Sequence, residues 1–203
     1  MNLQQIFTEL LVNNGFSEGN AIVRWTELEK AYSHKSRQYH NLTHLKEMII
    51  CFEEYRNQLQ CPDEVLYAIF YHDYVYNSSR KDNEAKSAEL AVSLLPEHST
   101  VNKDRIYKLI MVTKDHLCHD NEDEKWLIDF DLKILSKEWE DYMIYYKQIR
   151  KEYSIYPDFM YNPGRKKALQ HFLENKNIYQ TETFKNLYEQ QAIANIQREI
   201  DLL

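Results

Sequence analysis

Glycine and proline are scarce in this chain, which has three glycines and four prolines among its 203 residues. Tight hairpin turns depend on these residues, so their scarcity argues against a many-stranded sheet. Apolar residues recur instead at the spacing of amphipathic helices, as in LQQIFTELL at residues 3–11. The sequence therefore predicts an all-α fold.

Cysteine is also rare, and long apolar runs are missing. Cys51, Cys61 and Cys118 are odd in number and show no CxxC spacing, so neither a disulfide framework nor a zinc knuckle is indicated. No apolar run approaches the ~20 residues that span a bilayer, and the first residues lack the pattern of a secretory signal. We therefore expect a cytoplasmic protein without a membrane partner.

Basic residues are outnumbered by acidic ones. Lys and Arg total 25 and Asp and Glu total 32, so the formal net charge is −7. This charge disfavours long nucleic acids as partners, because they are themselves polyanions, and a small anionic ligand would need a local basic pocket. A chain of this length fits a single domain, residues 1–203, and leaves the oligomeric state open, a homo-oligomer included.

Polar stretches divide the helical pattern along the chain. HDNEDE at residues 119–124 predicts a solvated acidic loop, and YNPGR at residues 161–165 predicts a turn. A last helix is expected from Thr181 to the C-terminus. Asn41 is expected to cap the helix that begins with LTHL.

Three of the eight histidines lie in two short stretches, YHNLTHL at residues 39–45 and FYHDYVY at residues 70–76. Histidine is the side chain best suited to bind a metal or to move a proton near neutral pH. His72 and Asp73 are neighbours, and on a regular helix they would point about 100° apart. At the end of a helix they can converge on one ion if distant segments, such as that of His44, supply the other ligands.

Two aspartates lie in apolar surroundings in LIDFDLKIL, residues 127–135. Burial of an acid is costly unless the acid is paired or binds a metal. Asp131 is the better candidate for a metal ligand. Asp129 is its rival, but on a helix it faces elsewhere and is more consistent with a capping or supporting group.

Four residues reproduce in order the H…HD…D signature of the HD-domain superfamily of metal-dependent phosphohydrolases: His44, His72, Asp73 and Asp131. More narrowly, RQYHNLTHL, FYHDYVY, DNEAKSAELA, FDLKIL and YNPGR resemble a bacterial family of about this length known only as predicted HD-superfamily phosphohydrolases.

This resemblance extends from about residue 25 to the C-terminus. It implies a compact HD-type helical bundle. The metal-site core would lie at about residues 37–135, and the C-terminal helices, about residues 136–203, would pack on it.

The resemblance also implies one divalent ion held by His44, His72, Asp73 and Asp131. Two nitrogens and two or more oxygens suit Mn²⁺, Fe²⁺, Co²⁺, Ni²⁺, Zn²⁺ or Mg²⁺, so the donor set does not select the metal. The implied activity is hydrolysis of a nucleotide or other small phosphorylated metabolite through a metal-activated water. Related enzymes carry a further histidine between the HD pair and the last aspartate, and His116 lies in that place.

Other residues near the motifs are candidates for catalysis or substrate binding. Asp73 could orient the attacking water, Glu84 is a candidate general base, and His116 could bind phosphate or a second metal. Glu84 could equally be a charge that favours a helix start. Guanidinium groups bind phosphate bidentately, so cations near the motifs are candidates for substrate binding, as are polar neighbours. The expected substrate contacts are Arg37, His40, Asn41, Tyr76, Lys114 and Arg165.

Two other functions fit the same residues. A metal-stabilised module could sense a nucleotide or join a partner without turnover, because intact ligands do not distinguish binding from catalysis. A di-iron oxygenase with an HD-type fold is a weaker alternative, with His116 as an extra ligand and Glu84 as a bridge, because no clear second histidine ligand is present.

Overall fold

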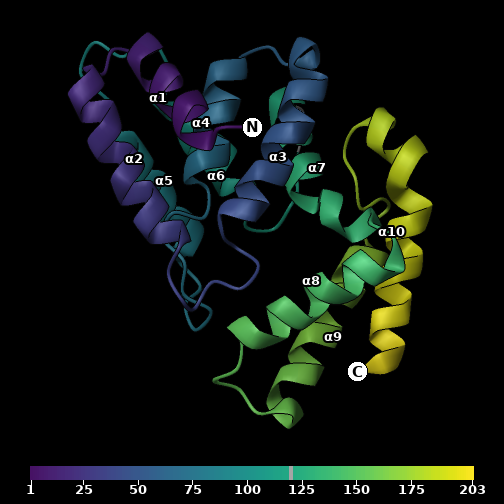
Figure 1. Ribbon diagram of the computed structural model, residues 1–203. Helices are drawn as coiled ribbons and strands as arrows, with labels where there is room; N and C mark the ends of the chain where they lie inside the picture. Colours follow the sequence, from purple (N-terminus) through teal and green to yellow (C-terminus); the bar gives the residue numbers. More distant parts are fainter. Residues whose placement is uncertain (119–120) are drawn as a thin grey trace.

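The computed structural model describes residues 1–118 and 121–203, and all the regular secondary structure in these residues is helical, with no strand (Figure 1). The all-α prediction is confirmed. The elements are, in chain order, α1 (Leu3–Asn13), α2 (Glu18–Tyr32), α3 (Leu42–Tyr55), η1 (Arg56–Gln58), α4 (Pro62–Tyr71), α5 (Asn83–Leu94), α6 (Lys103–Met111), α7 (Glu122–Leu132), η2 (Lys133–Ser136), α8 (Trp139–Glu152), α9 (Asp158–Glu174) and α10 (Glu182–Leu202).

Short polar side chains begin several of these helices. Asn41 accepts a hydrogen bond from the Thr43 amide at the start of α3, as predicted. Thr181 accepts one from the Phe184 amide at the start of α10. Such caps satisfy amide groups that have no partner within the helix, and therefore fix where each helix begins.

Both predicted irregular stretches are largely helical instead. Asn121 caps α7, which begins at Glu122, so only residues 119 and 120 of the expected acidic loop lie outside the described residues. Acidic residues in a first turn are favourable because they face the positive end of the helix dipole. The expected turn at residues 161–165 lies inside α9, Pro163 included.

The helical course of α9 through Pro163 follows from tertiary contacts. Proline removes one backbone hydrogen bond from a helix interior. Two residues later, however, the Arg165 guanidinium binds the Glu199 carboxylate of α10 at 2.7 Å and 3.1 Å. Tyr161 and Leu169 of the same helix are buried. These contacts hold the segment against the next helix and outweigh the local preference for a turn.

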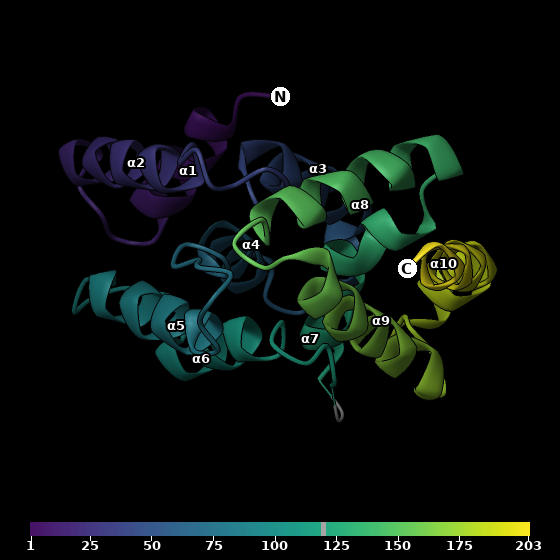
Figure 2. The same cartoon turned by 90° about the horizontal axis from the view of Figure 1, so that it is seen from below.

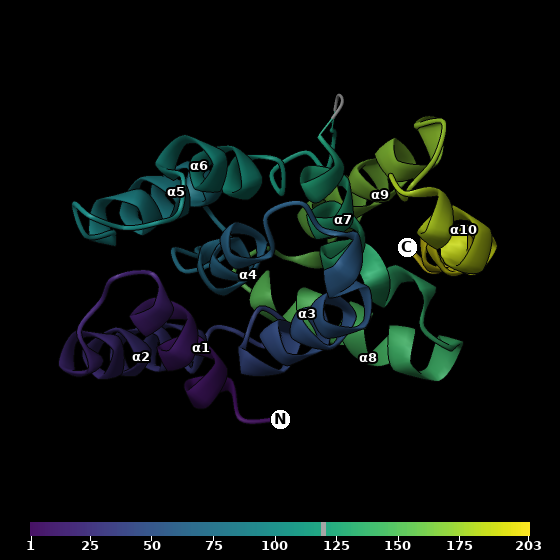
Figure 3. The same cartoon turned by 90° about the horizontal axis from the view of Figure 1, so that it is seen from above.

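The helix α4 lies at the centre of the molecule. Figures 2 and 3 show it between the α1–α2 pair and the α5–α6 pair, and it also packs on α3 and α7. Every residue from Val65 to Tyr71 is buried. A helix that is apolar on all sides is suited to such a position.

The last three helices, α8, α9 and α10, lie together on one side of the molecule (Figure 1). Both α8 and α10 pack on η2, and α10 also packs on α8 and α9. Buried apolar residues form one continuous cluster from Phe7 near the N-terminus to Ile200 near the C-terminus. Among the described residues, no helix combines the length and the apolar character that crossing a bilayer requires.

Candidate metal centre

Three helices that pack on one another bring the predicted ligands together. His44 lies in the first turn of α3, His72 is the C-cap of α4, and Asp131 is the penultimate residue of α7. Contacts join α3 with α4, α3 with α7, and α4 with α7. The ligand-bearing ends of these helices therefore meet at one place.

The ligand atoms of His44, His72 and Asp131 all lie within 4.8 Å of one another. The two Nε2 atoms are 3.3 Å apart, and Asp131 Oδ1 lies 3.2 Å from His44 Nε2 and 4.0 Å from His72 Nε2. Donors about 2.0–2.2 Å from a common ion lie roughly 3 Å apart at right angles and roughly 4 Å apart across it. The three residues therefore fit a divalent ion in both donor chemistry and spacing.

The ring of His72 is oriented by the backbone. Its Nδ1 lies 2.8 Å from the carbonyl oxygen of Ile69, and the side chain is buried. A carbonyl oxygen only accepts, so Nδ1 carries a hydrogen and Nε2 is the nitrogen left to bind a proton or a metal ion. Outer hydrogen bonds of this kind fix the tautomer and orientation of metal-binding histidines.

The charges around these residues favour a cation. Burial lowers the pKa of His72, but the charges of Asp73 and Asp131 outweigh it and raise that pKa to about 9. Burial raises the pKa of Asp131, yet hydrogen bonds from His116 and His44 hold it well below its usual range. The site thus retains negative carboxylates at neutral pH, and their potential attracts positive charge.

Asp73 adjoins the three-residue group without being part of it. Its Oδ2 lies 3.3 Å from His72 Nε2. Burial raises the pKa of Asp73, but the charges of His72 and His40 hold it well below its usual range. The structure thus brings the fourth predicted ligand to the edge of the cluster as an ionised carboxylate.

His116 contacts the second oxygen of Asp131, with Nε2 3.1 Å from Oδ2. The two oxygens of this carboxylate therefore face different imidazoles, His44 on one side and His116 on the other. His116 has a φ of 56°, the one positive φ outside glycine in the described parts of the chain. Such a backbone conformation is sparsely populated and is often found at functional sites.

Asp129 faces away from the cluster, as the capping interpretation predicts. Its carboxylate accepts hydrogen bonds from the amides of Gln180 and Thr181, at 2.6 Å and 2.8 Å, and from the Thr181 hydroxyl at 2.6 Å. Burial raises the pKa of Asp129 to about 7, although these hydrogen bonds lower it. This aspartate holds the segment that begins α10.

A cavity of about 600 Å³ opens beside the cluster. His72, Asp73, His116 and Asp131 line it on one side, and aromatic and apolar side chains of α8, α9 and the loop between them line the other. The remaining predicted site residues that border it are His40, Tyr76, Glu84, Lys114 and Arg165.

The cations of this cavity differ in availability. Arg165 is bound to Glu199 and also donates to the hydroxyl of Tyr145 at 3.2 Å, so its charge is already balanced. Lys114 makes no ion pair with any described residue. Lys114 is therefore the cation best placed to meet an anionic ligand there.

Arg37 and Asn41 do not line this cavity. Arg37 donates to the carbonyl oxygens of His40 and Tyr74, at 3.1 Å and 2.8 Å, and borders a separate cavity of about 1080 Å³. Asn41 caps α3 and donates to the Gln38 carbonyl at 2.8 Å. Both side chains hold the segment that leads into α3.

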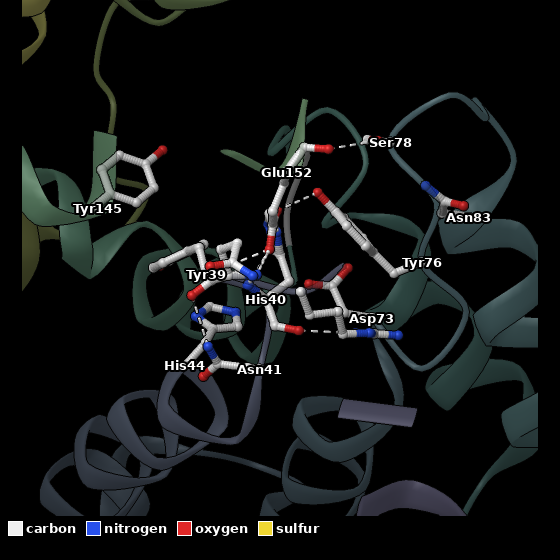
Figure 4. Close-up of polar contacts among 12 residues, drawn as sticks. Tyr39, His40, Asn41, His44, Asp73, Tyr76, Ser78, Asn83, Tyr145 and Glu152 are labelled. Atoms are coloured by element: carbon white, nitrogen blue, oxygen red, sulfur yellow. Dashed lines mark hydrogen bonds and ion pairs between the residues drawn. The ribbon is translucent and has the colours of Figure 1, made fainter. Parts of the chain in front are cut away.

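Glu152, the last residue of α8, is a site residue that the sequence interpretation missed. Figure 4 shows its carboxylate reaching His40 and Tyr76, both of which line the cavity. A signal was present, because Tyr142, Tyr145, Ile149 and Glu152 are spaced along one buried face of α8. An acid on an apolar stripe is the same signal that identifies Asp131.

Comparisons of the chain with protein-family models, with curated proteins and with solved structures find no match. The function proposed below therefore depends on the geometry of the site and on the motif resemblance.

Proposed function

We propose that this protein is a metal-dependent phosphohydrolase that acts on a nucleotide or another small phosphate ester. The observation that carries the proposal is the meeting of His44, His72 and Asp131, from three helices, within 4.8 Å beside a cavity of about 600 Å³. A cavity of that size suits a small metabolite. The excess of acidic residues in the chain disfavours a long polyanion.

A divalent ion held by these residues would polarise a phosphoryl oxygen and lower the pKa of a bound water. Asp73 borders both His72 and the cavity, so its carboxylate can accept a hydrogen bond from the attacking water and orient it. Lys114 can balance the charge of the phosphate. The cavity is lined by His72 and Asp131 of the metal site and by Asp73 and Lys114, which is the proximity that hydrolysis at one phosphorus requires.

Glu84 is the candidate general base. It lies in the first turn of α5, lines the cavity and makes no hydrogen bond or ion pair with another described residue. A carboxylate without a partner can accept a proton from water. Glu84→Gln would keep the size of the side chain and remove that capacity.

The proposal is tested by a substrate screen. The purified protein, loaded separately with Mn²⁺, Co²⁺, Ni²⁺, Mg²⁺ and Zn²⁺, is assayed against nucleotides and sugar phosphates, with His72→Ala as the blank. We expect release of phosphate from at least one class of ester by wild-type protein only. Tight binding of an ester without product would favour a sensing module, and neither binding nor turnover would overturn the proposal.

A di-iron oxygenase is the second candidate, and one observation favours it. Asp131 presents Oδ1 to His44 and Oδ2 to His116, an arrangement in which one carboxylate can bridge two ions. Iron content near two per chain, with an optical change that requires oxygen, would favour this function over hydrolysis. Iron content near one or below, with phosphate release, would exclude it.

A further inference from the structure

The Glu152 carboxylate is surrounded by five hydrogen-bond donors. Oε1 accepts from three successive amides, those of Gln38, Tyr39 and His40, at 2.7, 2.8 and 3.0 Å. Oε2 accepts from His40 Nδ1 and from the Tyr76 hydroxyl, each at 2.6 Å. The carboxylate is fully buried, so these donors are its whole environment.

These contacts fix where the hydrogens lie. Burial raises the pKa of Glu152, but the hydrogen bonds and charge of His40 outweigh it and lower that pKa to about 2. An ionised carboxylate only accepts hydrogen bonds, so Nδ1 of His40 carries a hydrogen and the Tyr76 hydroxyl donates. The other ring nitrogen of His40, Nε2, has no hydrogen-bond partner among residues 1–118 and 121–203.

His40 and Tyr76 line the metal cavity, whereas Glu152 does not. The ring of His40 lies 4.4 Å from the ring of Tyr76 and 5.9 Å from that of the metal-site residue His44, measured between centroids. The carboxylate therefore acts from behind the wall of the cavity, and Figure 4 shows it in contact with His40 and Tyr76.

We propose that Glu152 is a positioning residue that holds the His40 ring with Nε2 toward the phosphate ester in the cavity. The proposal rests on the proposed function. Carboxylates orient histidines in this way where the free nitrogen must meet a reacting group. Glu152 lies 112 residues from His40 in sequence, so the last turn of α8 completes a site begun by the segment before α3.

Two other carboxylates show what a merely structural role looks like. Asp123 accepts from the amides of Gln60 and Cys61, at 2.7 Å and 2.9 Å. Glu189 accepts from the amides of Ile178 and Tyr179. Both accept from pairs of successive backbone amides, and neither lines the cavity. Glu152 differs because two of its donors are side chains of the cavity wall.

The first arm of the test reads the tautomer of His40 by ¹H–¹⁵N NMR of the imidazoles in Zn²⁺-loaded protein. We expect hydrogen on Nδ1 in wild type, and on Nε2 as well when inorganic phosphate is bound, because the phosphate oxygens accept. In Glu152→Gln the amide oxygen can still accept from the backbone, which leaves the amide nitrogen facing His40 as a donor. We therefore expect hydrogen on Nε2 alone in that variant, which leaves a neutral ring that binds phosphate more weakly. An unchanged Nδ1 tautomer would overturn the proposal.

The second arm measures kcat and KM with p-nitrophenyl phosphate and the affinity of the Zn²⁺-loaded protein for inorganic phosphate. Glu152→Gln and His40→Ala should each lower kcat/KM about 10-fold to 100-fold, as loss of an outer partner commonly does. The double variant should be no worse than His40→Ala, because Glu152 acts through His40. Asp123→Asn is the matched control and should keep wild-type kcat.

The two arms separate this inference from the proposed function. If wild-type protein hydrolyses no ester, the proposed function fails, and phosphate affinity decides the inference. Weaker phosphate binding in both His40→Ala and Glu152→Gln, with the wild-type content of Zn²⁺, would still support it. Phosphate affinities equal to wild type, or additive losses in the double variant, would overturn it.

Discussion

Asp131 and Glu152 are two carboxylates with little or no exposure to solvent, and they differ in the partners that surround them. The side chain of Asp131 is 15% exposed and that of Glu152 fully buried. Asp131 faces imidazole nitrogens, among them His72 Nε2, which can exchange a proton for a metal ion. Glu152 faces five N–H and O–H groups. Backbone amides and a hydroxyl keep their hydrogens and leave no place for an ion, whereas an imidazole nitrogen can give up its proton and bind a metal ion.

The largest expected effect is a loss of metal affinity when Asp131 is replaced. Asp131→Asn removes an anionic ligand, so we expect metal affinity to fall by more than the roughly 100-fold loss typical of outer partners. Calorimetric titration with Mn²⁺ or Zn²⁺ measures this. Asp129→Asn, two residues away on the same helix, is the control. It should keep the metal and lose about 1–3 kcal/mol of stability, because its partners are backbone and hydroxyl donors.

Removal of the Glu152 carboxylate should lower the stability of the fold and leave metal binding unchanged. Glu152→Ala leaves three amides, an imidazole and a hydroxyl without their acceptor. We expect the free energy of unfolding to fall by about 3–5 kcal/mol, as when one partner of a buried pair is removed. Urea unfolding measures it. Glu189→Ala, at a half-buried site with two amide donors, should lose about 1 kcal/mol, and equal losses in the two variants would contradict the contrast.

Acid should remove the stabilisation that the ionised Glu152 carboxylate provides. The folded-state pKa, about 2, lies below the ordinary value of 4.5. The contribution is therefore fully present above about pH 4.5 and is lost as the pH falls toward 2. It amounts to about 3 kcal/mol. The difference in unfolding free energy between wild type and Glu152→Gln should shrink from pH 7 to pH 3, and a constant difference would argue against an ionised Glu152.

The smallest effect concerns the start of α3, which carries His44 to the metal site. Asn41→Ala removes the cap and should cost about 1 kcal/mol. Since His44 is also held by α4 and α7, its affinity for metal should change little. Thermal unfolding and metal titration on one sample give both quantities. A large loss of metal affinity would mean that the cap, and not the helix packing, positions His44.

Local pattern made part of this molecule predictable. Apolar spacing and polar caps indicated the helices, and the H…HD…D order indicated which side chains would meet. The turn expected at residues 161–165 was wrong because the bond between Arg165 and Glu199 holds that segment in α9. The sequence pattern around residue 163 carries no information about a partner as distant as Glu199.

The sequence alone determined the helical class and the residue types of the site, since both depend on periodicity and on side chains close in the chain. Tertiary structure decided which acid faces which partner: Asp131 the imidazoles, Asp129 the start of α10, and Glu152 the segment before α3. Every buried carboxylate must find donors or a cation. Which of these it finds depends on how distant helices pack, and that is a property of the folded chain as a whole.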